Sequence, residues 1–249
     1  MLQETRLIMG MPITICIAEG GAGARSMAEA FGYFDAVDRR FSTYKADSEI
    51  SAMNAGRLCR DAISAEMREV LALAEKTRVD SDGYFDIRRP DGSLDPSGIV
   101  KGWAVRNAAD LLREAGHRDF FVDAGGDIQA NGVNEDGEEW RTGIRNPFAE
   151  DEIIGAVRLS NRGIATSGNY ARGRHIYNPR QPGDELDDIV SMTIIGADVL
   201  EADRFATAAC AMGADGIYFI EETAGLEGLM VNAAGISTQT SGFGAFEIQ

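Results

Sequence analysis

The stretch "DPSGIVKGWAVRNAADLLREA", residues 95–115, predicts the most regular element of the chain. From Ile99 to Ala115 its apolar residues recur at three- and four-residue steps, which is typical of a helix with one buried face. Lys101 lies near the start of this helix, where the first N–H groups form a partial positive pole that a lysine opposes. The position therefore predicts that an anion joins Lys101. It also predicts that replacing Lys101 by methionine is neutral or mildly stabilising in the free protein.

On either side of this helix the sequence predicts a mixture of strands and helices. Apolar residues at helical spacing indicate helices over 24–44, 63–83 and 198–216, with Ser64 and Asp198 as N-caps. Apolar runs indicate strands at 6–9, 12–18, 119–126, 139–147, 153–160, 189–197 and 228–235. Strands follow one another more often than they alternate with helices, so we expect an α+β fold. The expected architecture is a single domain over residues 1–249, with mixed or antiparallel sheets and packed helices.

The overall charge limits the partners of the chain. Its 249 residues include 40 acidic and 24 basic ones, which gives a formal net charge of -16. Such a charge repels phosphate backbones and anionic lipids, so nucleic acid is not expected as a partner. No segment approaches the roughly 20 apolar residues of a membrane span, and the first residues lack a signal-peptide pattern. Three scattered cysteines fit reduced thiols, so we expect a cytoplasmic protein, or an exported one if a leader precedes this sequence.

Three polar clusters are candidates for a functional site. In "VDAGGDIQANG", residues 122–132, Asp123 and Asp127 flank two glycines after an apolar strand. Glycine lets a ligand approach the backbone closely, although a tight turn explains this pattern somewhat better. In "IATSGNYARGRHIYNPR", residues 164–180, hydroxyl groups and arginines surround His175, one of only two histidines. A structural role and a site role for His175 are about equally supported.

The third cluster is Asp203 and Thr207 in "EADRFATAAC". Four residues apart on a helix, the two side chains lie on one face. A carboxylate and a hydroxyl are hard oxygen ligands that suit Mg²⁺, which completes its shell with water and substrate phosphates. The alternative is an exposed helix carboxylate at Asp203 and a Thr207 that packs against alanines. Taken alone, the spacing favours that alternative.

Seven motifs in order resemble the FAD:protein FMN transferases of the ApbE family. They cover the chain from about Met9 to Gly213: "MGMPITI", "FSTYKADSEISAMN", "GYFDIR", "DPSGIVKGWAV", "FVDAGGDIQANG", "IATSGNYARGRHIYNP" and "EADRFATAACAMG". The resemblance implies a Mg²⁺-dependent enzyme that cleaves FAD at its pyrophosphate. It attaches FMN to a threonine of an acceptor flavoprotein and releases AMP.

The resemblance also implies roles for individual residues, position by position. Asp203, Thr207 and the backbone carbonyl of Gly98 match the Mg²⁺ ligands. His175 matches the histidine proposed to assist proton transfer, with Asp95 or a metal-bound hydroxide as alternatives for that role. The positions that match FAD contacts are Met9, Tyr44, Tyr84, Phe85, Asp86, Asp95 and Lys101. The aromatic residues among them could equally be ordinary core residues.

The chain also departs from the family pattern, and the departures leave the function open. The loop "NPRQPG", residues 178–183, has Asn178 where the family has an aspartate, and it lacks the family's threonine. A second aspartate that some members carry beside the metal threonine is Ala206 here. Two alternatives to the transferase therefore remain: a Mg²⁺-dependent FAD pyrophosphatase that releases FMN and AMP, and a module that binds FAD without turnover.

Overall fold

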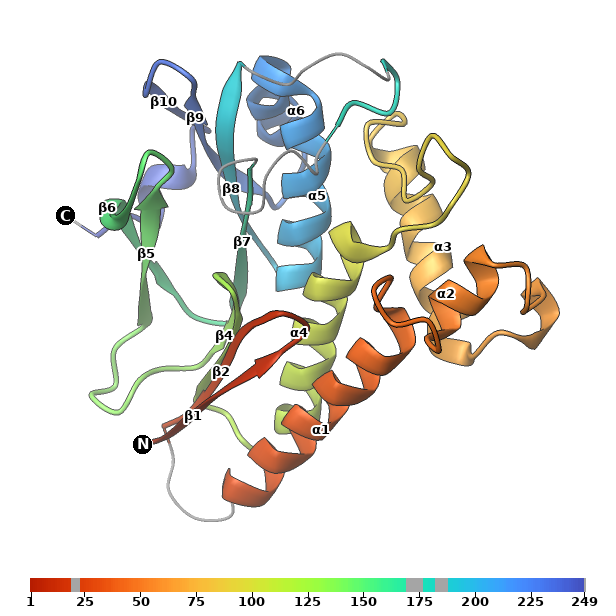
Figure 1. Ribbon diagram of the computed structural model, residues 1–249. Helices are drawn as coiled ribbons and strands as arrows, with labels where there is room; N and C mark the ends of the chain where they lie inside the picture. The colour runs from red at the N-terminus through yellow and green to blue at the C-terminus, as the bar shows by residue number, and fades with distance from the viewer. Residues whose placement is uncertain (19–22, 169–176, 182–187, 249) are drawn as a thin grey trace.

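The computed structural model describes residues 1–18, 23–168, 177–181 and 188–248 (Figure 1). Its strands are β1 Leu2–Ile8, β2 Met11–Ile17, β3 Phe120–Ala124, β4 Asp127–Asn131, β5 Trp140–Asn146, β6 Ala149–Leu159, β7 Arg162–Gly168, β8 Ile189–Gly196, β9 Glu227–Asn232 and β10 Ser237–Gln239. Its α-helices are α1 Gly23–Phe41, α2 Glu49–Asn54, α3 Ala65–Asp80, α4 Ser97–Glu114, α5 Val199–Ala211 and α6 Gly216–Glu222. Three short 3-10 turns are η1 Arg60–Ala62, η2 Gly213–Asp215 and η3 Phe243–Ala245.

The main sheet has eight strands in the order β1-β2-β3-β4-β7-β8-β9-β10. Neighbouring strands in it run antiparallel throughout. β5 and β6 form a separate antiparallel hairpin that leaves the sheet after β4 and returns to it at β7. The expected α+β class with antiparallel sheets and packed helices is confirmed.

Alternation of side chains along the strands builds a core on each face of the sheet. In β2, Ile13, Ile15 and Ile17 are fully buried against the helices, whereas Cys16 points into a second core on the opposite face. Successive side chains of a strand point to opposite faces, so a strand covered on both sides is apolar at almost every position. Figure 1 shows the two covers, with the β5–β6 hairpin on one side of the sheet and α1, α4 and α5 on the other.

Helices α4 and α5 cross closely at a glycine. A Cβ added to Gly102 would lie 2.7 Å from Cβ of Asp203 and 3.0 Å from the carbonyl oxygen of Val199. Because glycine has no side chain, the backbone of α4 can approach α5 at this point. The crossing brings residues near the start of α4 beside the middle of α5, and this contact positions the candidate site.

The predicted helices correspond to α1, α3, α4 and α5, although α5 ends at Ala211, five residues before the expected end. Helices α2 and α6, the edge strand β10 and two central strands were not predicted. Ser64 and Asp198 cap α3 and α5 as expected, each accepting a hydrogen bond from a backbone N–H three residues ahead. Helix α4 begins at Ser97, two residues before the expected start. β4 and β7 were missed because "DIQAN" and "RGIATSG" mix polar residues and glycine, so they lack the apolar alternation that indicates a strand.

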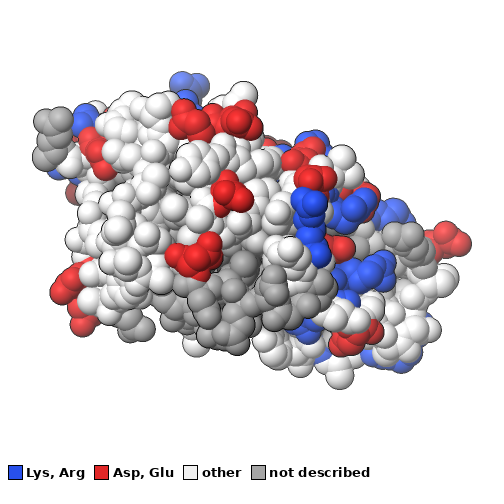
Figure 2. Space-filling view, turned by 90° about the horizontal axis from the view of Figure 1, so that it is seen from above, with Lys and Arg blue, Asp and Glu red and all other residues white. Residues whose placement is uncertain are grey.

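The charged groups of the described surface are mixed in sign. Figure 2 shows basic side chains gathered toward one end of the face seen from above, with acidic side chains among them. None of the helices in the described part of the chain combines the length and the hydropathy that crossing a bilayer requires.

Candidate active site

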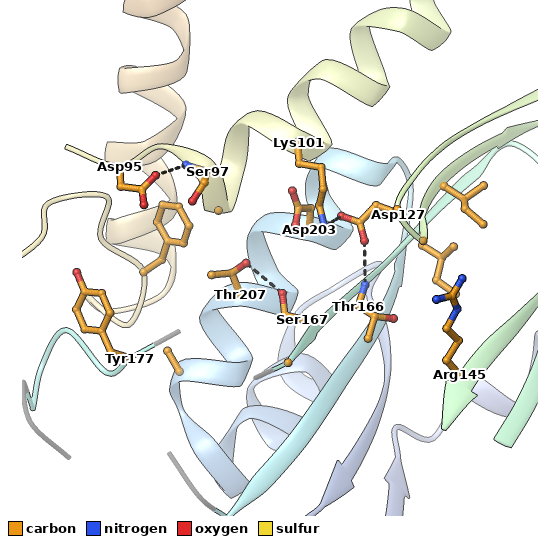
Figure 3. Close-up of a pocket in the computed structure, with 18 of the residues that line it drawn as sticks. Asp95, Ser97, Lys101, Asp127, Arg145, Thr166, Ser167, Tyr177, Asp203 and Thr207 are labelled. Carbon is orange, nitrogen blue, oxygen red and sulfur yellow. Dashed lines mark hydrogen bonds and ion pairs between the residues drawn. The ribbon is translucent and has the colours of Figure 1, made fainter. Parts of the chain in front are cut away.

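A pocket of about 910 Å³ opens where α4, α5, the β3–β4 turn, the β5–β6 hairpin and the end of β7 meet (Figure 3). Its volume lies within the range of small-molecule and cofactor sites. The residues that line it include eight of the candidates from the sequence: Tyr84, Phe85, Asp86, Asp95, Gly98, Lys101, Asp203 and Thr207. Segments that are far apart in the sequence thus meet in one cavity.

Gly98 and Thr207 face each other across the contact between α4 and α5. A Cβ added to Gly98 would lie 3.4 Å from Cγ2 of Thr207 and 3.8 Å from its Oγ1. The Oγ1 of Thr207 is also 3.2 Å from Oγ of Ser167, which lies in β7 (Figure 3). The hydroxyl of Thr207 therefore lies in a small polar recess that has no side chain on the α4 side.

Asp203 is a buried acid with few donors around it. Its side chain is only 3% exposed, which excludes the alternative of an exposed helix carboxylate. Its Oδ2 accepts a hydrogen bond of 2.8 Å from the N–H of Gly102. Burial raises the pKa of Asp203 to about 7, against the opposing effect of the nearby Lys101 ammonium, and the neighbouring Asp127 raises it further. A cation bound next to Asp203 would favour its ionised form.

Lys101 has a partner that the sequence did not predict. It is the fifth residue of α4, beyond the first turn, and its ammonium forms an ion pair with the carboxylate of Asp127. The side chains are 15% and 2% exposed. The expectation that Lys101 lies against the positive pole at the helix start is therefore wrong. The neutral effect expected for Lys101→Met in the free protein no longer follows. Removing the ammonium would leave Asp127 buried beside Asp203 without its counter-ion.

Asp127 is the residue of this site that the sequence analysis did not assign. It begins β4 directly after Gly125 and Gly126, whose φ angles of 63° and 102° make the tight turn. Its Oδ1 accepts a hydrogen bond of 3.2 Å from the N–H of Thr166 in β7. The signal in the sequence was the glycine pair between two aspartates, which favoured a tight turn, and the burial of Asp127 was not predicted.

Asp123, on the other side of this turn, is also an acid with a raised pKa. Burial is the main cause, and the charge of Asp127 adds to it. A 2.7 Å hydrogen bond from the N–H of Gly126 and the cations Arg145 and Lys101 act in the opposite direction. Three carboxylates therefore surround one lysine at this side of the pocket.

The other wall carries aromatic and acidic side chains. Phe85 is 3% exposed and belongs to the helical core, with Cε2 3.2 Å from the Cβ position of Gly98. Tyr84 lies 4.8 Å, ring centroid to guanidinium carbon, from Arg180. Asp95 forms an ion pair with Arg89, and its Oδ1 accepts a 3.1 Å hydrogen bond from the N–H of Ser97, two residues ahead, where α4 begins. Phe85 is thus a core residue and a pocket residue at the same time.

Two of the expected residues do not line the pocket as described, and a third cannot be placed in it. Met9 lies in the β1–β2 turn with a φ of 56°, and Tyr44 is 97% exposed. Neither is among the residues that line the pocket in the described part of the chain. Tyr44 is therefore not a core residue. His175 lies outside the described residues.

The donors around Asp203 suit a hard divalent cation that also takes oxygen atoms from elsewhere. They are the carboxylate of Asp203, the hydroxyl of Thr207 and a glycine at position 98 whose missing side chain leaves room beside that hydroxyl. Among the described residues no three His, Cys, Asp or Glu side chains form a metal-binding group. The set fits Mg²⁺, which keeps several waters and binds through one or two carboxylates together with substrate phosphates.

Most of the chain matches the sequence model of one protein family. The model of the ApbE family matches residues 9–89 and 87–230. The chain belongs to the ApbE family. The FAD:protein FMN transferase of Vibrio cholerae is 30% identical to this ApbE-family chain over 151 residues, which are 57% of this chain and 45% of that protein. The FAD:protein FMN transferase of Haemophilus influenzae is 24% identical over 242 residues, 72% of this chain and 70% of that protein. The matches to the first relatives span about half of their length.

Solved structures of ApbE proteins share the fold. The flavin transferase ApbE from Vibrio cholerae superposes with a TM-score of 0.85 at 23% identity, over 98% of each chain. The ApbE protein from Thermotoga maritima has a TM-score of 0.85 at 20% identity, over 100% of this chain and 99% of that one. The arrangement of the eight-stranded sheet, the inserted hairpin and the helices is thus an ApbE fold.

Proposed function

We propose that this chain is a Mg²⁺-dependent FAD:protein FMN transferase. It would cleave FAD at the pyrophosphate, attach FMN through a phosphoester to a threonine of an acceptor flavoprotein, and release AMP. The observation that supports this best is the convergence of Gly98, Asp203 and Thr207 with Lys101 in one pocket. These residues come from two helices that are distant in the sequence, and hard oxygen donors lie beside a cation, which suits a diphosphate. The names of the relatives support the same activity.

Asp203, Thr207 and the carbonyl of Gly98 are the proposed Mg²⁺ ligands. When bound, the metal would supply charge neutralisation for the phosphate oxygens. The buried carboxylate of Asp203 is suited to this role because its ionised form is costly without a cation. A Cβ at Gly98 would lie 3.2 Å from Cε2 of Phe85 and in van der Waals contact with Thr207, so it would occupy the space beside that hydroxyl.

The remaining pocket residues would hold and orient FAD. Tyr84 and Phe85 offer apolar ring surfaces for isoalloxazine or adenine, and Asp86 and Asp95 lie beside them as hydrogen-bond acceptors. Met9 and Tyr44 remain proposed FAD contacts from outside the pocket wall. Transfer mainly requires positioning of the reacting groups and stabilisation of charge.

In the proposed step the hydroxyl oxygen of the acceptor threonine bonds to the phosphorus of the FMN half. The bond from that phosphorus to the oxygen shared with AMP breaks, and AMP leaves with the electron pair. We propose that His175 accepts the proton of the attacking hydroxyl, with Asp95 as the alternative. A base within hydrogen-bond reach of the nucleophile typically contributes 10²- to 10⁴-fold.

Incubation with FAD and Mg²⁺, with and without an acceptor protein, tests the function. A mass gain of the acceptor together with AMP release is the expected result. AMP release at the same rate without an acceptor would favour the pyrophosphatase, and tight FAD binding without AMP would favour the binding module. In the same assay Asp203→Ala should abolish AMP release while the protein stays folded, and Glu114→Ala, an exposed carboxylate at the end of α4, is the control. Full Mg²⁺-dependent activity of Asp203→Ala would sink the metal assignment.

A further inference from the structure

One of the basic side chains that line the pocket has no described acid as a direct partner. Among the described lining residues the basic ones are Arg89, Lys101 and Arg145. Arg89 forms an ion pair with Asp95, and Lys101 forms one with Asp127. The side chain of Arg145 makes no hydrogen bond or ion pair with any residue in the described part of the chain, although its backbone belongs to the β5–β6 ladder. It is therefore the pocket cation whose charge is not cancelled by direct contact with a described acid.

A local irregularity of β5 places Arg145 in the pocket wall. The β5–β6 register shifts on both sides of Arg145, which pairs with Ile153. Such bulges redirect a side chain and are frequent next to active sites. Figure 3 shows Arg145 on the β5 side of the pocket, opposite Asp95 and Tyr177. Its guanidinium therefore approaches the cavity from the hairpin, whereas the proposed metal ligands approach from α4 and α5.

Asp123 is the acid whose pKa Arg145 lowers, but it is a weak competitor for the guanidinium. Its Oδ1 is bound to the N–H of Gly126 at 2.7 Å within its own turn. Burial raises its pKa, so its charged form is disfavoured. The guanidinium has five N–H donors in a planar fork that matches the oxygens of a phosphate.

We propose that Arg145 binds an oxyanion of the diphosphate of FAD and so positions the substrate from the hairpin side of the pocket. This assignment rests on the proposed function and adds a substrate-binding residue to it. Lys101 is held by Asp127, so the pair presents little net charge to an incoming anion. Arg145 supplies a full charge and a bidentate donor for the same group.

The test measures binding without requiring turnover. FAD, ADP and riboflavin are titrated calorimetrically, with Mg²⁺ present, into the wild type, Arg145→Gln and Arg145→Lys. Arg141→Gln is the matched control, because Arg141 lies on the same strand, is exposed and pairs with Glu138 outside the pocket. Arg145→Gln should weaken FAD and ADP binding at least tenfold and change riboflavin binding less than twofold, since riboflavin has no phosphate. Arg145→Lys should recover part of the loss, and Arg141→Gln should bind like the wild type.

Two outcomes would overturn the assignment. One is that Arg145→Gln binds FAD and ADP within twofold of the wild type, including the case in which only the KM for the acceptor protein rises. In that case Arg145 would bind a carboxylate of the acceptor protein and not the diphosphate of FAD. The other is an equal loss of riboflavin affinity, which would mean a general effect on the pocket. AMP release by the wild type is measured in parallel: its absence with the expected binding pattern would refute the transferase and leave Arg145 as a diphosphate-binding residue.

Discussion

Replacing Lys101 by methionine tests whether the free protein depends on the ion pair with Asp127. The acid is buried, with 2% of its side chain exposed, and the lysine side chain is 15% exposed. Removing one partner of a buried pair costs about 3–5 kcal/mol, because the remaining charge stays desolvated. Since the lysine retains some contact with water, we expect the lower end, a loss of about 3 kcal/mol in the free energy of unfolding. In a protein of this size that corresponds to a fall in Tm of roughly 6–12 °C.

Thermal and urea unfolding of the metal-free, FAD-free protein measure this loss. Lys76→Met is the control, because Lys76 pairs with Asp80 on the surface of α3 with 61% of its side chain exposed, and such pairs contribute about 1 kcal/mol or less. The double variant Lys101→Met/Asp127→Asn should regain most of the stability, since it removes both charges. A Tm of Lys101→Met within 2 °C of the wild type, or above it, would refute the reasoning and restore the view that this lysine serves only a ligand.

Three further predictions concern Asp203, Gly102 and Tyr44. In EDTA the free energy of unfolding should fall as the pH rises from about 4 to about 7. The reason is that burial raises the pKa of Asp203 to about 7, so the folded protein holds a proton that the unfolded chain has lost. In urea-unfolding measurements over this pH range, the Asp203→Asn variant should show little change of stability with pH. Gly102→Ala should destabilise the protein by about 1–3 kcal/mol, because the new Cβ overlaps Asp203. Gly32→Ala in α1 is the control: no atom lies within 4 Å of its new Cβ, so it should stabilise the protein by about 0.5–1 kcal/mol. Thermal unfolding compares the two variants. Tyr44→Ala should leave Tm unchanged because the ring is 97% exposed, and a fall in FAD affinity measured by fluorescence would then report direct contact with the flavin or adenine.

The helices α4 and α5, which carry most of the candidate site, could be predicted from the sequence, whereas the site strands β4 and β7 could not. The apolar face from Ile99 to Ala115 and the caps Ser64 and Asp198 are local signals, and each corresponds to a real element boundary or face. β4 and β7 are central strands, yet their residues face the polar pocket in part, so their composition resembles that of loops. The apolar pattern thus hides these two site strands, whereas β3 and β5, which also line the pocket, were predicted.

The site shows the same division between local and non-local information. The spacing of Asp203 and Thr207 is local, so both could be placed on one helical face from the sequence. The pairing of Lys101 with Asp127 joins α4 to β4 and depends on the crossing of the helices over the sheet, which no local pattern encodes. Arg145 was not singled out because an exposed arginine in a strand is ordinary until the bulge and the pocket around it are known.

One wall of the pocket is formed by the β5–β6 hairpin, which lies outside the main sheet. β4 and β7 are neighbours in the main sheet, so the hairpin is an excursion whose length and pocket-facing residues do not enter the sheet register. Trp140, Ile144, Val157 and Leu159 attach it to the core beneath, while Thr142, Arg145 and Ile153 line the cavity. Ile144 belongs to both sets, and apart from it attachment to the core and contact with the cavity reside in different side chains of the two strands. A graft that keeps the four apolar anchors would therefore exchange the cavity-facing side chains without altering the sheet or the helices α4 and α5.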